Sequence, residues 1–176
     1  MKAPQYISII LFILINVLFV DKYTARMTEW HVVASIAYAL FTFAVICAIP
    51  HLLKRIHYPT KWVWVLACGM ILTGIGIQYA IDPMVLQVDR WSAIHHFLDG
   101  IFEGIYPYGQ QTHLGGYGSP FPVWQILHMP FYALNNVGLS IFVVLGVYIF
   151  TLWKIYGNQV GLVAIVLLLL SPALWY

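Results

Sequence analysis

Residues 31–50 read HVVASIAYALFTFAVICAIP, a run without any Asp, Glu, Lys or Arg. A helix needs about 20 apolar residues to cross the hydrocarbon core of a bilayer. A charge-free run of this length is typical of a transmembrane helix, and it decides the class of fold. Comparable runs occur on either side of it, at residues 6–20, 62–80, 137–153 and 160–176. We therefore expect a single all-α integral membrane domain with about five transmembrane helices.

The composition supports this class and excludes several others. Of the 176 residues, 62% are hydrophobic and only 8% are charged, whereas a soluble domain carries about 25% charged residues. So few charges do not cover a water-facing surface, which excludes an ordinary cytosolic enzyme. The net charge of +2 is too small to favour a nucleic-acid partner. Cys47 and Cys68 both lie inside apolar runs and match no metal-binding or disulfide pattern.

The basic residues indicate an orientation in the membrane. Lys and Arg are enriched in short cytoplasmic loops. If the N-terminus is cytoplasmic, the five basic residues on the inside are Lys2, Lys54, Arg55, Lys61 and Lys154. The three on the outside are Lys22, Arg26 and Arg90. We therefore expect a multi-pass protein with a cytoplasmic N-terminus and with the long loop 81–119 outside the cytoplasm.

This long loop holds most of the polar residues that could carry chemistry. Its segment 89–103 has helical periodicity. One side carries Asp89, His96, Asp99 and Glu103, and the other carries Trp91, Ile94, Phe97, Leu98 and Ile101. The pattern predicts an amphipathic helix in the membrane interface. Beyond the loop, prolines punctuate a short apolar segment, and we expect a second interfacial helix over 123–134.

Asp89 is the first candidate for a catalytic residue. A carboxylate at the boundary between membrane and water can act as a general base toward a hydroxyl group, and it can also help to hold a metal ion. The alternative is a structural role, in which the Asp89 side chain caps the first turn of the helix.

The other polar side chains of the loop each allow two interpretations. Asp99 and Glu103, spaced i, i+4, could bind a divalent cation together with His96, or they could form a solvated helix face. Arg90 could hold a phosphate group through two hydrogen bonds, or its side chain could extend toward lipid headgroups. His113 is an isolated histidine, for which a structural role is the alternative. We expect Arg90, His96, Tyr108 and His113 to contact substrate.

The motifs in this half of the chain resemble those of the glycosyltransferase C superfamily. Members are multi-span membrane enzymes that take a sugar from a polyprenyl-phosphate carrier. The likeness covers roughly the second half of the chain. It is carried by Asp89-Arg90-Trp91, by Gly104-Ile105-Tyr106-Pro107-Tyr108, by Tyr117–Pro122, by His128-Met129-Pro130 and by Leu170–Ala173.

The resemblance implies an inverting sugar transfer at the outer face of the membrane. Asp89 would match the loop carboxylate of the family, which is the base for the acceptor hydroxyl. The donor would be a lipid-linked sugar phosphate, and some members also use a divalent metal. The chain departs from the family pattern because no second carboxylate stands at positions 90–91 and because it ends after five expected spans. We therefore expect an N-terminal portion or truncated member, with a second polypeptide supplying the missing spans.

Two other classes of function remain open. The single unpaired carboxylate is also compatible with a non-catalytic membrane scaffold or lipid-binding subunit, which would use the loop as a docking surface. A small channel or transporter is a third class. It is disfavoured because the centres of the expected spans carry no charged residue.

Overall fold

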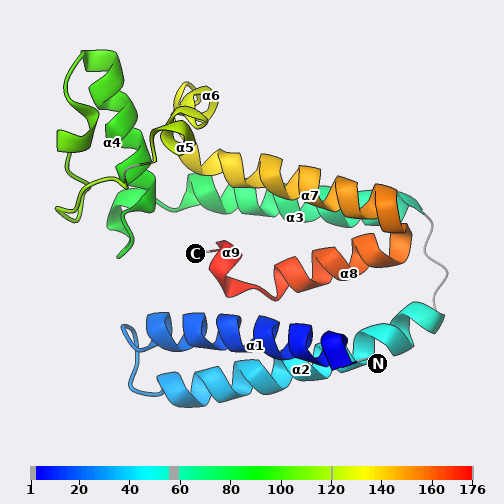
Figure 1. Ribbon diagram of the computed structural model, residues 1–176. Helices are drawn as coiled ribbons and strands as arrows, with labels where there is room; N and C mark the ends of the chain where they lie inside the picture. The colour runs from blue at the N-terminus through cyan, green and yellow to red at the C-terminus, as the bar shows by residue number, and fades with distance from the viewer. Residues whose placement is uncertain (1–2, 56–59, 120, 176) are drawn as a thin grey trace. The chain divides into compact units, whose positions relative to one another are not determined.

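The computed structural model describes residues 3–55, 60–119 and 121–175, and within these ranges it contains helices and turns but no strand (Figure 1). The predicted all-α class is therefore confirmed for the described residues. The α-helices are α1 (Ala3–Thr24), α2 (His31–Arg55), α3 (Thr60–Ala80), α4 (Arg90–Glu103), α5 (Pro122–Ile126), α6 (Met129–Tyr132), α7 (Ser140–Tyr156), α8 (Asn158–Leu169) and α9 (Pro172–Trp175). The 3-10 helices are η1 (Pro83–Val85), η2 (Pro107–Gly109) and η3 (Val137–Leu139).

Four helical segments are long and apolar enough to cross a membrane. In the part of the chain that the structure describes, they are Tyr6–Thr24, His31–Leu53, Thr60–Ala80 and Val137–Tyr156. A lipid environment offers backbone groups no hydrogen-bond partners. An unbroken helix can cross it because its backbone groups form hydrogen bonds with one another. The predicted membrane class is confirmed at this level, and the cytoplasmic placement of the N-terminus stays a prediction.

The structure differs from the expected span over 160–176, because α8 ends at Leu169 and α9 begins at Pro172. The 12 residues of α8 measure about 18 Å along the axis, which is short for a hydrocarbon core of about 30 Å. Pro172 lacks a backbone N–H, so it breaks the hydrogen-bond ladder of the helix. The carbonyl of Leu170 instead accepts a hydrogen bond from the Tyr38 hydroxyl, at 2.6 Å.

The chain forms two compact units, which are described separately. One contains the residues up to Ala67 together with those from Ile149 onward, and the other is Cys68–Tyr148. Helices α3 and α7 contribute residues to both units. The loop that carries the sequence-predicted site lies entirely within Cys68–Tyr148.

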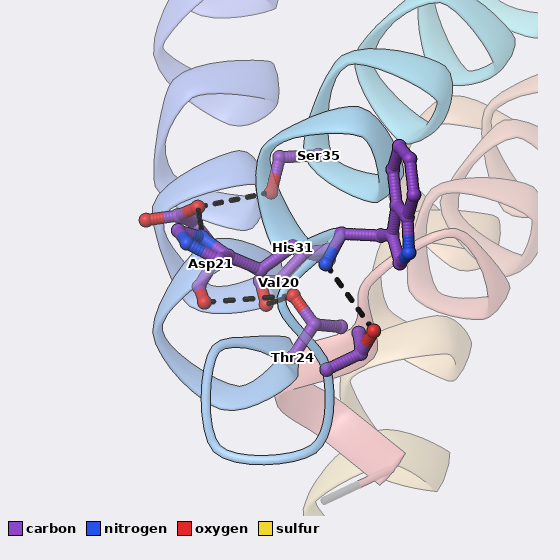
Figure 2. Close-up of polar contacts among 7 residues, drawn as sticks. Val20, Asp21, Thr24, His31 and Ser35 are labelled. Atoms are coloured by element: carbon purple, nitrogen blue, oxygen red, sulfur yellow. Dashed lines mark hydrogen bonds and ion pairs between the residues drawn. The ribbon is translucent and has the colours of Figure 1, made fainter.

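In the first unit, α1 and α2 form a hairpin that is closed by a polar cluster (Figure 2). Asp21 is the only carboxylate in the four membrane-length segments. Its Oδ1 accepts hydrogen bonds from His31 Nδ1 at 2.6 Å and from Ser35 Oγ at 3.4 Å. The Thr24 hydroxyl donates to the Val20 carbonyl at 2.7 Å. These bonds give partners to the polar groups at the end of the hairpin, which would otherwise be costly beside lipid.

In the second unit, α4 packs its apolar side into a small core. Phe97, Leu98 and Val137 are the buried residues of this core, and Leu98 is fully buried. Partly buried side chains surround them: Trp91, Ile94, Ile101, Tyr108, Met129 and Tyr132. The α4 residues among them belong to the apolar side expected from the helical periodicity. The core therefore joins α4 to η2, α6 and η3.

The segment 123–134 is not one helix, so that prediction is wrong. Helix α5 ends at Ile126, and α6 begins at Met129. Pro130 lies in the first turn of α6, where its missing N–H is tolerated, whereas in the interior of a longer helix it would remove a hydrogen bond. The buried side chain of His128 stabilises the break, because its Nδ1 donates to the Trp124 carbonyl at 2.7 Å.

Helix α4 ends at Glu103 because Gly104 adopts a left-handed conformation with φ +72°. Glycine is favoured there because it has no Cβ to clash with the backbone. The amide of Ile105 then donates to the Gly100 carbonyl at 2.9 Å. The chain consequently turns back and places η2 against Gly100.

Gly100 permits this close approach, and we expect Gly100→Ala to destabilise the unit. A Cβ at Gly100 would lie 3.0 Å from Pro107 Cα and 3.2 Å from Gln110 Cγ. Overpacking of this kind costs about 1–3 kcal/mol, more than the gain of up to ~1 kcal/mol from alanine in a helix. Gly69→Ala in α3 is the matched control, because its Cβ would meet no atom within 4 Å. Denaturant titration in detergent measures the free energy of unfolding, and equal values for the two variants would contradict the prediction.

Candidate functional site

Asp89 occupies the position immediately before α4 and is half-buried. Its carbonyl accepts the first hydrogen bond of the helix, from the Ala93 amide at 2.8 Å. Its side chain makes no hydrogen bond to the helix N-terminus. Instead, Oδ2 accepts a hydrogen bond from Thr112 Oγ1 at 2.9 Å. The structural alternative, in which this side chain caps the first turn of α4, is therefore wrong.

Thr112 belongs to a compact turn, residues 111–117. The Thr112 amide donates to the Gly116 carbonyl at 2.8 Å, and the Gly116 amide donates to Thr112 Oγ1 at 3.0 Å. Gly115 makes the turn possible through its positive φ of +81°. Gln111 and Tyr117 pair as an isolated antiparallel bridge at its base. The glycine-rich stretch thus builds a rigid turn around one threonine.

The 111–117 turn is joined to α4 at two further levels. The His113 amide donates to Ser92 Oγ at 3.2 Å, and His96 Nδ1 donates to the Gln111 carbonyl at 2.6 Å. Together with the bond between Thr112 and Asp89, these contacts follow α4 over its first two turns. The turn is therefore held against the helix N-terminus by side chains from both partners.

This arrangement holds the Asp89 carboxylate on one side and leaves it free on the other. A Cβ at Gly116 would lie 3.0 Å from Asp89 Oδ2, so the absence of a side chain at Gly116 lets the turn reach the carboxylate. Across the described ranges, Oδ1 of Asp89 has no hydrogen-bond partner. A carboxylate in this position can accept a proton from a bound hydroxyl.

Comparison with family models, curated proteins and solved structures finds no match. Only the geometry of the chain's own residues therefore indicates a function.

Among the residues expected to contact substrate, Arg90 and Tyr108 lie in different surroundings. Arg90 is exposed in the first turn of α4, immediately after Asp89. Tyr108 is half-buried in η2, and its ring packs edge-on against Phe97 with 4.9 Å between the ring centroids. Arg90 is therefore accessible to a ligand, whereas the ring of Tyr108 takes part in the core.

The two histidines in this group, His113 and His96, differ in how many ring nitrogens are bonded within the protein. Nε2 of His113 donates to the Leu86 carbonyl at 2.9 Å, and its Nδ1 lies 2.7 Å from Ser92 Oγ. Both ring nitrogens are thus engaged within the protein, which fits the structural role considered for His113. His96 uses only Nδ1, so its Nε2 has no hydrogen-bond partner among the described residues.

The structure does not bring Asp99, Glu103 and His96 together. His96 is bonded to the 111–117 turn, Glu103 is exposed at the end of α4, and Asp99 faces His95. In the described part of the chain, no group of three or more His, Cys, Asp or Glu side chains converges as metal ligands would. Asp99 and Glu103 therefore share a helix face without forming a ligand set with His96.

Asp99 belongs instead to a cluster that sequence analysis missed. Its Oδ2 lies 3.2 Å from His95 Nδ1, and its Oδ1 accepts a hydrogen bond from the Tyr132 hydroxyl at 2.6 Å. The His95 ring stacks on Trp91 with 4.4 Å between centroids. The i, i+4 spacing of His95 and Asp99 could have indicated their contact. Tyr132 comes from α6, and no local pattern predicts its place in the cluster.

The hydrogen bond to Asp99, followed by burial and nearby negative charge, raises the pKa of Tyr132 to about 12. A pKa above the unfolded value of about 10 means that this contact contributes full stability below pH 10. That contribution is lost as the pH rises through about 12. We expect Asp99→Asn to return the Tyr132 pKa toward 10. An NMR titration of ¹³Cζ-labelled tyrosine, assigned with Tyr132→Phe, measures both values, and an unchanged pKa in Asp99→Asn would contradict the assignment.

Proposed function

We propose that the chain is a membrane glycosyltransferase, or the N-terminal portion of one. It would transfer a sugar from a polyprenyl-phosphate donor to a hydroxyl acceptor at the outer face of the membrane. The observation that carries the proposal is the state of Asp89, which is half-buried, with Oδ2 held by Thr112 and with no partner for Oδ1 among the described residues. Four membrane-length helices in the same chain provide a reason for a lipid-borne donor.

The proposed reaction requires little covalent chemistry from the residues of the protein. The acceptor oxygen forms a bond to the anomeric carbon of the sugar while the bond from that carbon to the phosphate oxygen breaks. The hydroxyl proton passes to Asp89, and the polyprenyl phosphate leaves with the bonding electrons. Because a glycosyl phosphate is already activated, positioning and charge stabilisation provide most of the catalysis.

Other residues receive roles from their positions. Arg90 is exposed next to Asp89, and its guanidinium is suited to holding the departing phosphate. His96 is in contact with the 111–117 turn and offers Nε2 to the acceptor. Tyr108 and His113 hold the loop in place. Both carboxylate oxygens of Asp99 are already bonded, to His95 and to Tyr132. The phosphate of the donor would therefore have to supply some of the ligands of any divalent metal.

One observation favours a second candidate, a non-catalytic scaffold or lipid-binding subunit. The bond from Thr112 to Asp89 fastens the 111–117 turn to α4, and a carboxylate performs that role without any chemistry. In this case the segment would act as a docking surface. The two candidates differ in the role of the Asp89 charge. If the hydrogen bond from Thr112 is kept, removal of the charge affects only the function of the transferase.

The proposed function can be tested with two membrane preparations. One comes from cells that lack the chain, and the other comes from the same cells after the chain has been restored. Such membranes keep any partner polypeptide that supplies further spans. They are incubated with radiolabelled sugar on a polyprenyl phosphate, and sugar transfer and free polyprenyl phosphate are both measured. We expect both products only when the chain is present. Equal product in the two membrane preparations would contradict the transferase and favour the scaffold.

A further inference from the structure

Residues 104–153 contain no Asp, Glu, Lys or Arg. Only the last part of this stretch belongs to the membrane-length segment Val137–Tyr156. The preceding residues form η2, the 111–117 turn, α5 and α6, which lie outside the four membrane-length segments. A water-exposed connection of this length would normally carry charged residues. The absence of charge therefore indicates that part of this connection faces lipid.

An apolar groove lies on α5 within this stretch. It is lined by Ser119, Phe121, Pro122, Val123, Trp124 and Leu127. Phe121, Val123 and Leu127 are exposed by 67%, 70% and 62%, respectively. A contiguous apolar patch of this kind marks a membrane or protein contact. Its composition matches acyl chains, since among the described lining residues only the Ser119 hydroxyl and the Trp124 indole N–H are polar side-chain groups.

The groove lies shortly before the membrane-length segment Val137–Tyr156 in the chain. A Cβ at Gly138 would lie only 2.5 Å from Gln78 Oε1, so the start of Val137–Tyr156 and the last turn of α3 are packed together. The Asn136 amide donates to the Phe131 carbonyl of α6 at 3.0 Å. Figure 1 shows α5 and α6 at this end of α7. Helices α5 and α6 therefore lie at the end of α7 where the membrane-length segment Val137–Tyr156 begins.

We propose that the α5 groove is a lipid-binding site that takes an acyl chain of the surrounding bilayer. Helix α5 then lies below the headgroups, with the groove facing the hydrocarbon. The exposed apolar side chains of α7, among them Val143 and Val144, lie in a membrane-length segment and require the same occupant. The position of α5 at the end of α7, together with the absence of charge, favours lipid over a water-soluble partner. The proposal does not depend on sugar transfer.

Spin labelling of the full chain in phosphatidylcholine vesicles tests the depth of the groove. A nitroxide is attached at Val123→Cys, and separately at Leu127→Cys, in a background with Cys47 and Cys68 changed to serine. Both positions are exposed, so the substitutions disturb little packing. Collision with oxygen reports lipid, and collision with a water-soluble nickel chelate reports solvent. We expect the ratio of oxygen to nickel collisions to be several-fold higher at both positions than at the control.

The control is Glu103→Cys, since Glu103 is exposed and charged at the end of α4. Nickel-dominated collisions at Val123 and Leu127, equal to those at Glu103, would overturn the proposal. Spin–spin broadening at Val123 that disappears on dilution with unlabelled chain would also overturn it, because a second copy would then fill the groove. High oxygen collision without such broadening supports the lipid site.

Discussion

Asp89→Asn should lower sugar transfer by about 10²–10⁴-fold, which is the usual contribution of a general base. The amide oxygen of asparagine can still accept the hydrogen bond from Thr112, so the 111–117 turn should stay joined to α4. What the variant loses is the ability to take a proton from the acceptor hydroxyl. The transfer assay in complemented membranes measures the rate, and the level of inserted chain is measured in the same membranes.

Two further variants separate chemistry from structure. Asp82→Asn is the matched control, because Asp82 is an exposed carboxylate that only caps η1 through the Met84 amide, at 2.9 Å. It should leave transfer unchanged. Thr112→Val keeps the Asp89 charge but removes the bond that positions it, so a smaller loss of transfer is expected. Full activity of Asp89→Asn with normal insertion would remove Asp89 from the mechanism and support the scaffold.

Ser92→Ala should destabilise the contact between α4 and the 111–117 turn. Ser92 is fully buried, and its hydroxyl accepts from the His113 amide, lies 2.7 Å from His113 Nδ1 and contacts the Asp89 carbonyl at 3.1 Å. Among the described residues, alanine would leave the His113 amide and His113 Nδ1 without a partner, whereas the Asp89 carbonyl would keep its bond from the Ala93 amide. A buried polar group in that state costs roughly 1–3 kcal/mol. Hydrogen exchange of the 111–117 amides should accelerate by a factor that corresponds to this loss.

Ser119→Ala provides the comparison for this prediction, since Ser119 is an exposed serine outside α4. We expect its exchange in the 111–117 turn to match that of the unmodified chain. Each variant removes one serine hydroxyl, so any difference between their exchange rates comes from the burial and hydrogen bonding of that hydroxyl. Equal exchange rates in Ser92→Ala and Ser119→Ala would show that the bond between Ser92 and His113 does not hold the turn.

The membrane-length helices could be predicted because their signal is local. A run of apolar residues of sufficient length must form a helix in lipid, whatever the rest of the chain does. Breaks inside such runs were harder to predict. The turn before Pro172 and the break between α5 and α6 depend on where freed carbonyls find donors. Tyr38 supplies one of these donors to Leu170, and His128 supplies another to Trp124.

The candidate site was predicted at the level of residues but not at the level of partners. Asp89 was singled out by its place before a helix, and the structure does place it there. Its bond to Thr112, which is 23 residues away, depends on the path of the loop. The path also brings Gly116 close to the carboxylate, where a Cβ would lie 3.0 Å from Asp89 Oδ2. The pairing of Asp99 with Tyr132, 33 residues away, depends on folding in the same way.

The sequence by itself determined the all-α membrane class, four of the five expected long apolar helices and the position of Asp89 next to α4. These properties depend on segment length, periodicity and side-chain type, which act over a few residues. Only the tertiary structure decided that Asp89 binds Thr112, that His113 is held by Ser92 and Leu86, and that Gly100 must lack a side chain. Such contacts join residues far apart in the chain, and they form because the packed core of α4, η2 and α6 brings them within hydrogen-bond distance.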